Sequence, residues 1–130
     1  MKILSVLTGL LIISVTIKAQ TIEDVREYRD GSQLEVKISN GSSSTISMSG
    51  FGSKYLGGWC GKAVVVVHER AKNDTQVYVY MWNKANNALN KMYDFSLCNN
   101  CVVKAVTQSG IVAKRPDGDN QHYDFNGNRK

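Results

Sequence analysis

The chain has 130 residues and a formal net charge of +5, from 16 Lys and Arg against 11 Asp and Glu. This length suits one domain built around one hydrophobic core. The basic residues are scattered, whereas a nucleic-acid-binding module usually carries a dense basic stripe, so we expect no nucleic-acid partner.

Residues 1–19 have the pattern of a secretory signal peptide. Lys2 is followed by an apolar run of 15 residues from Ile3 to Ile17, and the small residue Ala19 precedes Gln20. The run is shorter than the roughly 20 residues of a membrane span. We expect cleavage after Ala19 and a secreted domain, extracellular or periplasmic, over residues 20–130 with no transmembrane segment. A retained signal anchor is the alternative.

The first element of this domain is predicted to be a short helix over residues 21–30. Thr21 can cap it, Gly31 can end it, and Ile22, Val25 and Tyr28 recur at roughly helical spacing.

The remaining chain is predicted to form short strands. Polar and apolar residues alternate, or β-branched residues cluster, over 33–39, 45–49, 63–68, 75–83, 93–97, 102–107, 111–115 and 121–125. Asn40-Gly41 and Pro116-Asp117-Gly118 predict turns, and five glycines predict an irregular loop over residues 50–61. Residues 82–93 also fit a helical face, but their asparagines favour a strand, a break and a second strand.

This spacing of strands predicts an all-β fold, an antiparallel β-sandwich or small barrel of seven to eight strands with a short N-terminal helix. Ala63 to His68 is apolar up to its last residue, so both of its faces are expected to be buried. That favours packed layers.

Three cysteines, Cys60, Cys98 and Cys101, predict one disulfide and one unpaired thiol in an oxidising compartment. A bond from Cys60 to Cys98 or Cys101 would close a loop of about 40 residues and contribute about 4 kcal/mol through chain entropy. A Cys98–Cys101 bond contributes less by this route. The long-range bond is therefore preferred.

The C-x-x-C pair formed by Cys98 and Cys101 also suggests a thiol–disulfide protein. In redox folds the first cysteine usually opens a helix, whereas a strand is predicted here over 102–107. The simpler interpretation is that Cys98 and Cys101 flank a hairpin turn and that one or both of them lock it.

No other catalytic group, metal site or cofactor is predicted, so the chain is more simply a binding protein than an enzyme. His68 and His122 have no nucleophile motif beside them. A zinc site would need Cys60, His68, Cys98 and Cys101 to converge in space. The Asp117–Asp124 turn lacks the glycine and glutamate of a calcium loop.

An aromatic stripe is the best candidate for a binding surface. At strand spacing Tyr78, Tyr80 and Trp82 point to one side, and Val77, Val79 and Met81 point to the other. If the stripe faces outward, it is a stacking platform that Tyr55 and Trp59 extend. If it faces inward, it fills the second layer of a sandwich.

The leading functional hypothesis is a non-enzymatic domain that binds an extracellular glycan, peptide or protein through this stripe and the glycine-rich loop. The alternatives are the thiol–disulfide protein and a structural protein that assembles by pairing strands between chains.

Overall fold

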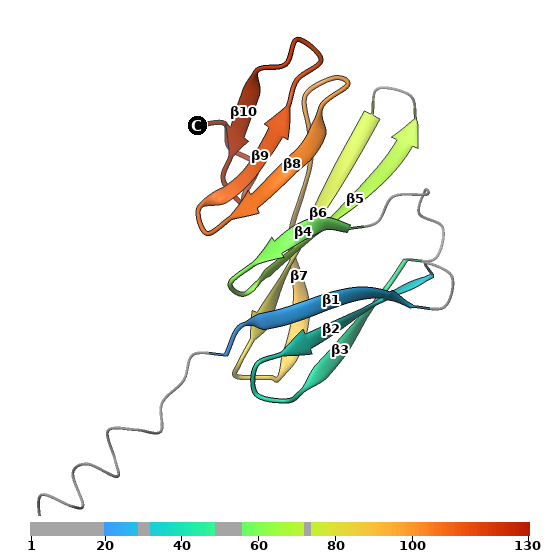
Figure 1. Ribbon diagram of the computed structural model, residues 1–130, viewed down its shortest axis with the longest axis vertical. Helices are drawn as coiled ribbons and strands as arrows, with labels where there is room; N and C mark the ends of the chain where they lie inside the picture. Colours follow the sequence, from blue (N-terminus) through green and yellow to red (C-terminus); the bar gives the residue numbers. More distant parts are fainter. Residues whose placement is uncertain (1–19, 29–31, 49–55, 72–73) are drawn as a thin grey trace, which may run out of the picture.

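A computed structural model describes residues 20–28, 32–48, 56–71 and 74–130 (Figure 1). The described chain is all-β, as predicted, and contains no helix. Its strands are β1 (Ile22–Tyr28), β2 (Gln33–Ile38), β3 (Ser43–Ser47), β4 (Leu56–Cys60), β5 (Ala63–Ala71), β6 (Asp74–Asn83), β7 (Ala88–Ser96), β8 (Val102–Thr107), β9 (Gly110–Lys114) and β10 (Asn120–Tyr123).

These strands form three antiparallel sheets, each built from strands that follow one another in sequence. A central sheet has the order β4-β5-β6-β7, and three-stranded sheets with the orders β1-β2-β3 and β10-β9-β8 accompany it. In Figure 1 the β1–β3 sheet lies beside the lower part of the central sheet and the β8–β10 sheet lies beside its upper part.

Two hydrophobic clusters join the sheets. The N-terminal core contains residues of β1, β2 and β3 together with Val64, Val66 and Trp82 of the central sheet. The C-terminal core contains Ala63, Val65, Val67, Val77 and Val79 of the central sheet with Ile111, Ala113 and Tyr123 of the last sheet. Alternate residues of β5 therefore enter opposite cores, and the prediction that both faces of this strand are buried is confirmed.

The predicted helix over 21–30 is wrong, because residues 22–28 form strand β1. Ile22 pairs with Ile38 and Asp24 pairs with Lys37, so Glu23 is an extra residue in a β-bulge. A bulge shifts the alternation of side chains by one position. Ile22 and Val25 consequently share the buried face at a spacing of three, which imitates a helical period.

The strand count and the barrel alternative are also corrected. The described residues form ten strands instead of seven or eight, and their sheets do not close into a barrel. The predicted strands did not include β1 and β4.

Strand β4 occupies part of the predicted glycine loop. Gly58 has a φ of +143°, and a Cβ there would come within 2.9 Å of Val106 Cγ2. Glycine therefore lets β4 lie close to β8 of the neighbouring sheet. Residues 50–55 of that loop, including Tyr55, lie outside the described residues.

Two of the predicted turns and breaks are confirmed. The Asn40-Gly41 turn joins β2 to β3, and Gly41 has a φ of +91°. Residues 82–93 form a strand, a turn and a strand.

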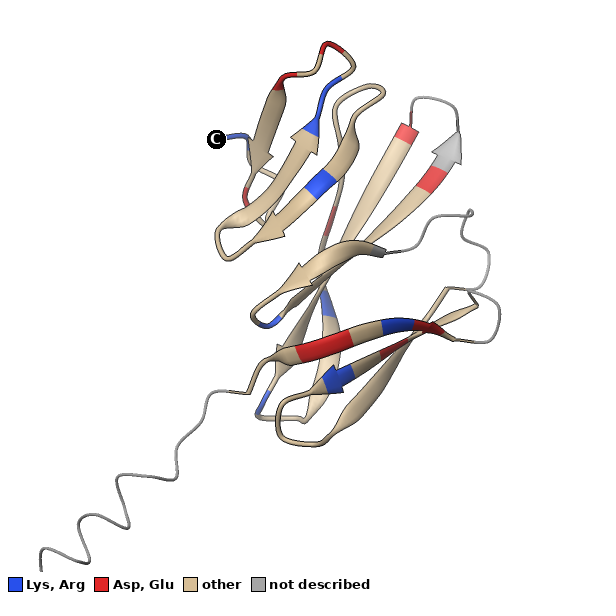
Figure 2. Cartoon of the chain, viewed as in Figure 1, with Lys and Arg blue, Asp and Glu red and all other residues tan. Residues whose placement is uncertain are grey.

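The predicted signal peptide, residues 1–19, also lies outside the described residues. Within the described ranges no helix is long and apolar enough to cross a membrane. Charged residues are spread over all three sheets (Figure 2).

Candidate binding cleft

The aromatic stripe of β6 faces the N-terminal core. Trp82 is buried, with 4% of its surface exposed, and Tyr78, Tyr80 and Trp59 are partly buried against the same cluster. The sequence left open whether the stripe faces outward as a platform or inward as part of a layer. The structure has it inward, in a layer between sheets. A ligand-binding role for these residues and for Tyr55 stays a prediction.

Polar and charged neighbours hold these rings in place. The Trp82 indole Nε1 donates a hydrogen bond to Gln20 Oε1 at 3.0 Å. The Lys91 ammonium lies 5.3 Å from the centre of the Tyr78 ring, and His68 stacks on the same ring with centroids 6.4 Å apart. Burial, and secondarily the neighbouring Tyr78, raises the pKa of Tyr80 above its usual value. The rings thus have limited free surface on which a sugar could stack.

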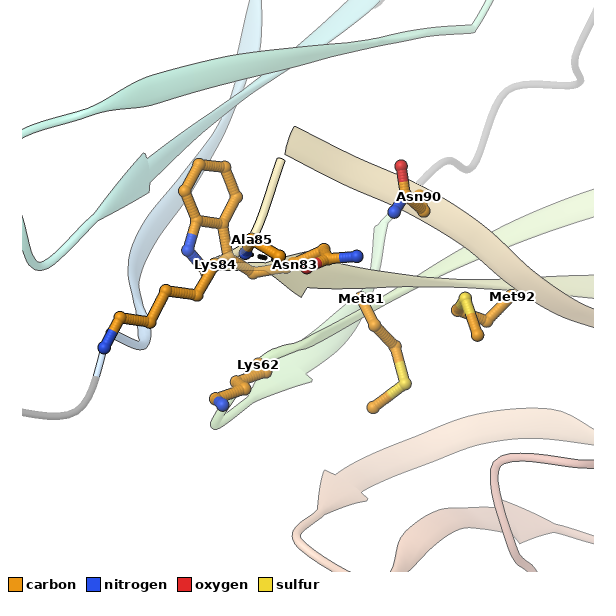
Figure 3. A pocket seen from close by; sticks show the side chains of 8 residues that line it. Lys62, Met81, Asn83, Lys84, Ala85, Asn90 and Met92 are labelled. Atoms are coloured by element: carbon orange, nitrogen blue, oxygen red, sulfur yellow. Dashed lines mark hydrogen bonds between the residues drawn. The ribbon is translucent and has the colours of Figure 1, made fainter. Parts of the chain in front are cut away.

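A shallow cleft of about 610 Å³ lies where β6 turns into β7 (Figure 3). We call it the methionine cleft, because Met81 and Met92 point into the same space in Figure 3. It is lined by Lys62, Met81, Trp82, Asn83, Lys84, Ala85, Asn90 and Met92. Trp82 is the one residue of the predicted site that belongs to it.

A second β-bulge places Met92 in this cleft. Val79 pairs with Tyr93 and Tyr80 pairs with Lys91, so Met92 is the extra residue on β7. Met81 packs toward the C-terminal core, and the bulge turns Met92 to the same side. Met92 is nevertheless 51% exposed, so this part of the sheet face carries apolar surface in contact with water.

The charge of the methionine cleft is positive. Lys62 and Lys84 are exposed, and none of the described residues that line the cleft carries a carboxylate. Neither lysine forms an ion pair with any residue that the structure describes. The turn that carries Lys84 is ordered, because the Ala85 amide donates to Asn83 Oδ1 at 2.9 Å and Asn87 adopts a φ of +54°. The cleft therefore combines the thioether side chains of Met81 and Met92 with the flexible cationic side chains of two exposed lysines.

The disulfide joins Cys98 to Cys101, and Cys60 is free. The preferred long-range bond from Cys60 is thus wrong. Through its pairing with Ala63, Cys60 lies level with Met81 of β6. Cys98 follows the end of β7, beyond the pair that Ser96 forms with Gln76 of β6. Five residues along β6 separate these positions by about 17 Å at about 3.3 Å per residue. A disulfide needs Cα atoms within about 7 Å.

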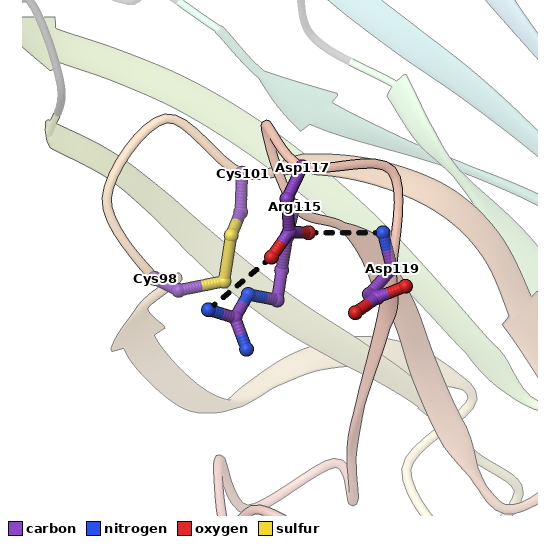
Figure 4. A network of polar contacts seen from close by, with 5 residues as sticks. All are labelled: Cys98, Cys101, Arg115, Asp117 and Asp119. Atoms are coloured by element: carbon purple, nitrogen blue, oxygen red, sulfur yellow. Dashed lines mark hydrogen bonds and ion pairs between the residues drawn. A yellow bond between two sulfur atoms is a disulfide. The ribbon is translucent and has the colours of Figure 1, made fainter.

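The disulfide lines a second cleft, of about 360 Å³, with Asn99, Arg115, Pro116, Asp117, Gln121 and Arg129. Arg115 Nη2 lies 3.6 Å from Asp117 Oδ2, and Asp117 Oδ1 accepts a hydrogen bond from the Asp119 amide at 3.0 Å (Figure 4). The Cys98 amide donates to the Tyr123 hydroxyl at 3.1 Å, and the Cys101 amide donates to the Cys98 carbonyl at 3.1 Å. We call this second site the disulfide cleft.

The acidic turns near the C-terminus use their carboxylates to hold the backbone. Asp124 Oδ1 accepts hydrogen bonds from the amides of Asn126 and Asn128, at 3.0 and 2.9 Å. These bonds, the Asn128 amide first, lower the pKa of Asp124. Among the described residues no group of three or more His, Cys, Asp or Glu side chains is arranged to hold a metal ion.

No protein-family model matches this chain, and no significant match was found among curated proteins or solved structures.

Sequence reasoning missed both lysines and Met92 as candidate site residues. Strict alternation back from Tyr93 places Met92 on the polar face with Asp94, and only the pairing of β7 with β6 shows that Met92 lies in a bulge. Lys62 and Lys84 belong to turns that are 22 residues apart in sequence and meet only through the pairing of β5 with β6.

Proposed function

We propose that this protein is an exported, non-enzymatic binding domain whose methionine cleft holds an acidic, extended segment of a peptide or protein. The observation that carries the proposal is the exposed Met92 beside Met81, flanked by Lys62 and Lys84 with no carboxylate in the lining. The signal pattern of residues 1–19 and the Cys98–Cys101 disulfide support export, because disulfides persist in oxidising compartments.

The chemistry of the lining favours a peptide over a glycan. Sugar rings are recognised by stacking on aromatic faces, and the faces of Tyr78 and Trp82 are packed against protein groups. Thioethers adapt to apolar side chains of different shapes, which suits a leucine or a similar residue of a partner. Ammonium groups at the rim attract carboxylates on either side of that residue.

The assembly alternative has less support. Strand β7 forms one edge of the central sheet, and an unprotected edge can pair with another chain. The bulge at Met92 and the exposed Lys91 both interrupt this edge. Natural proteins use bulges and lysines to prevent such pairing.

Isothermal titration calorimetry with two synthetic peptides tests the proposal. One peptide alternates glutamate with leucine over five residues, and the other replaces each glutamate by glutamine. We expect the acidic peptide to bind more tightly, and salt to weaken its binding, since exposed charges are screened.

Charge reversal locates the site. The double variant Lys62→Glu/Lys84→Glu should raise the Kd of the acidic peptide by about tenfold, because two attractions become repulsions of about 1 kcal/mol or less each. The matched control, Lys37→Glu/Lys114→Glu, changes two exposed lysines outside the cleft by the same total charge. An equal loss of peptide affinity in both variants would mean that only the net charge of the protein matters, and it would refute the site. Equal binding of the two peptides would refute the acidic ligand.

A further inference from the structure

The disulfide cleft has features that a bond serving only to lock a turn does not need. Cys98 is partly exposed, whereas Cys101 is buried with 2% of its surface exposed. An incoming thiol therefore meets one sulfur before the other. Both cysteines line a cleft of about 360 Å³ that is large enough for a small thiol to enter.

The bond also contributes little to the connectivity of the fold. Its cysteines are three residues apart, so it closes a very short loop. The turn between them is held independently, by the Cys101 amide on the Cys98 carbonyl and by the Cys98 amide on the Tyr123 hydroxyl. Opening the bond leaves both thiols near each other and poised to close again.

The charges of the cleft select the kind of thiol. Arg115 and Arg129 line it together with one carboxylate, that of Asp117, which lies 3.6 Å from Arg115. Arg129 has no ion-pair partner among the described residues. Figure 4 shows the Arg115 guanidinium beside the disulfide. The net positive lining attracts an anionic group and also stabilises a departing thiolate.

We propose that Cys98–Cys101 is a thiol–disulfide exchange site for small anionic thiols, with Cys98 Sγ as the sulfur that is attacked. The thiolate of the small thiol forms a bond to Cys98 Sγ, and the Cys98–Cys101 bond breaks. The electron pair leaves on Cys101 Sγ, which then takes a proton from water. A second small thiolate attacks the sulfur of the bound thiol and releases Cys98 as a thiolate. Two small thiols are thereby oxidised to their disulfide while the protein disulfide is reduced to two thiols.

Kinetics of reduction in the folded protein test this inference, which does not depend on a ligand in the methionine cleft. The experiment uses the mature chain with Cys60→Ser, so that no third thiol takes part. The protein is treated with 3-mercaptopropionate, 2-mercaptoethanol or cysteamine, and the rates are compared at equal thiolate concentration. Quenching with acid and peptide mapping by mass spectrometry then identify the sulfur that carries the adduct.

We expect native-state reduction at millimolar thiol, fastest with the anionic reagent, and the adduct on Cys98. Arg129→Gln should lower the rate ratio of the anionic to the neutral thiol by about threefold, and Arg115→Gln should lower it in the same direction. The control Lys114→Gln, an exposed cation outside the cleft, should leave the ratio unchanged.

Three results would overturn the inference. The bond would be purely structural if it resisted all three thiols until urea unfolded the protein. An adduct on Cys101 would contradict the assigned sulfur. A ratio that fell equally in the Lys114→Gln control would remove the role of the cleft.

Discussion

The buried position of Trp82 makes a prediction that separates the two interpretations of the aromatic stripe. Trp82→Ala removes a side chain that is 4% exposed and packed in the N-terminal core. Burial of about 200 Å² at about 25 cal/mol per Å² corresponds to about 5 kcal/mol. Measured truncations of large aromatic residues cost about 3–5 kcal/mol. The variant also loses the indole hydrogen bond to Gln20, worth about 1 kcal/mol.

Urea unfolding followed by far-UV circular dichroism measures this loss, and the signal does not depend on the removed indole. Met92→Ala is the matched control, because Met92 lies on the neighbouring strand with half of its surface exposed and should cost about 0.5 kcal/mol or less. Trp82→Phe should fall between the two. A free energy of unfolding within about 1 kcal/mol of the parent for Trp82→Ala would refute the inward-facing stripe and restore it as an outer platform.

Three further predictions concern the last sheet and its turns. Gly110 has a φ of +149°, and a Cβ there would overlap the Tyr123 carbonyl oxygen, so Gly110→Ala should cost more than about 2 kcal/mol in urea unfolding. Gly118→Ala, at a φ of +93° but with open space around it, should cost about 1 kcal/mol, and equal losses would contradict the steric argument. The pKa of Asp124 is lower in the folded protein than the usual carboxyl value of about 4. Its ionised carboxylate therefore stabilises the fold fully above about pH 4, and this contribution is lost as the pH falls through the lower pKa of the folded state. Urea midpoints at pH 5 and pH 2.5 should therefore differ more for the parent than for Asp124→Asn, and equal differences would exclude this role. Cys98→Ser breaks the bond at its partly exposed cysteine and should cost about 2 kcal/mol, the chain-entropy value for so short a loop, and a loss near the 4 kcal/mol of a long-range bond would point to a different pairing.

The sequence predicts most strands because alternation and β-branched runs report burial directly. Ala63 to Val67 shows this best, since a continuous apolar run has few alternatives to a strand that is buried on both faces. The Asn40-Gly41 and Pro116-Asp117-Gly118 turns likewise follow from local chemistry, as the positive φ angles of Gly41 and Gly118 show.

Bulges explain two of the failures. The extra residue Glu23 makes β1 imitate a helix, and the extra residue Met92 interrupts the alternation of β7, so alternation alone does not place it beside Met81. A bulge depends on the partner strand, so the sequence of one strand does not reveal it.

The prediction of the cysteine pairing was wrong for a different reason. The loop-entropy argument ranks possible bonds by their effect on the unfolded chain, whereas the folded geometry decides which sulfurs meet. Cys60 lies at one end of the central sheet, and Cys98 lies beyond the other.

NMR of methyl-labelled methionine can show whether the acidic peptide occupies the methionine cleft. The described chain contains Met48, Met81 and Met92, and Met48 is buried in the N-terminal core, so it serves as an internal reference. On titration with the acidic leucine–glutamate peptide, we predict saturable shifts of the Met81 and Met92 methyl signals and an unchanged Met48 signal. Binding that leaves Met81 and Met92 unmoved, or that shifts all three signals alike, would contradict the assignment of this cleft as the site.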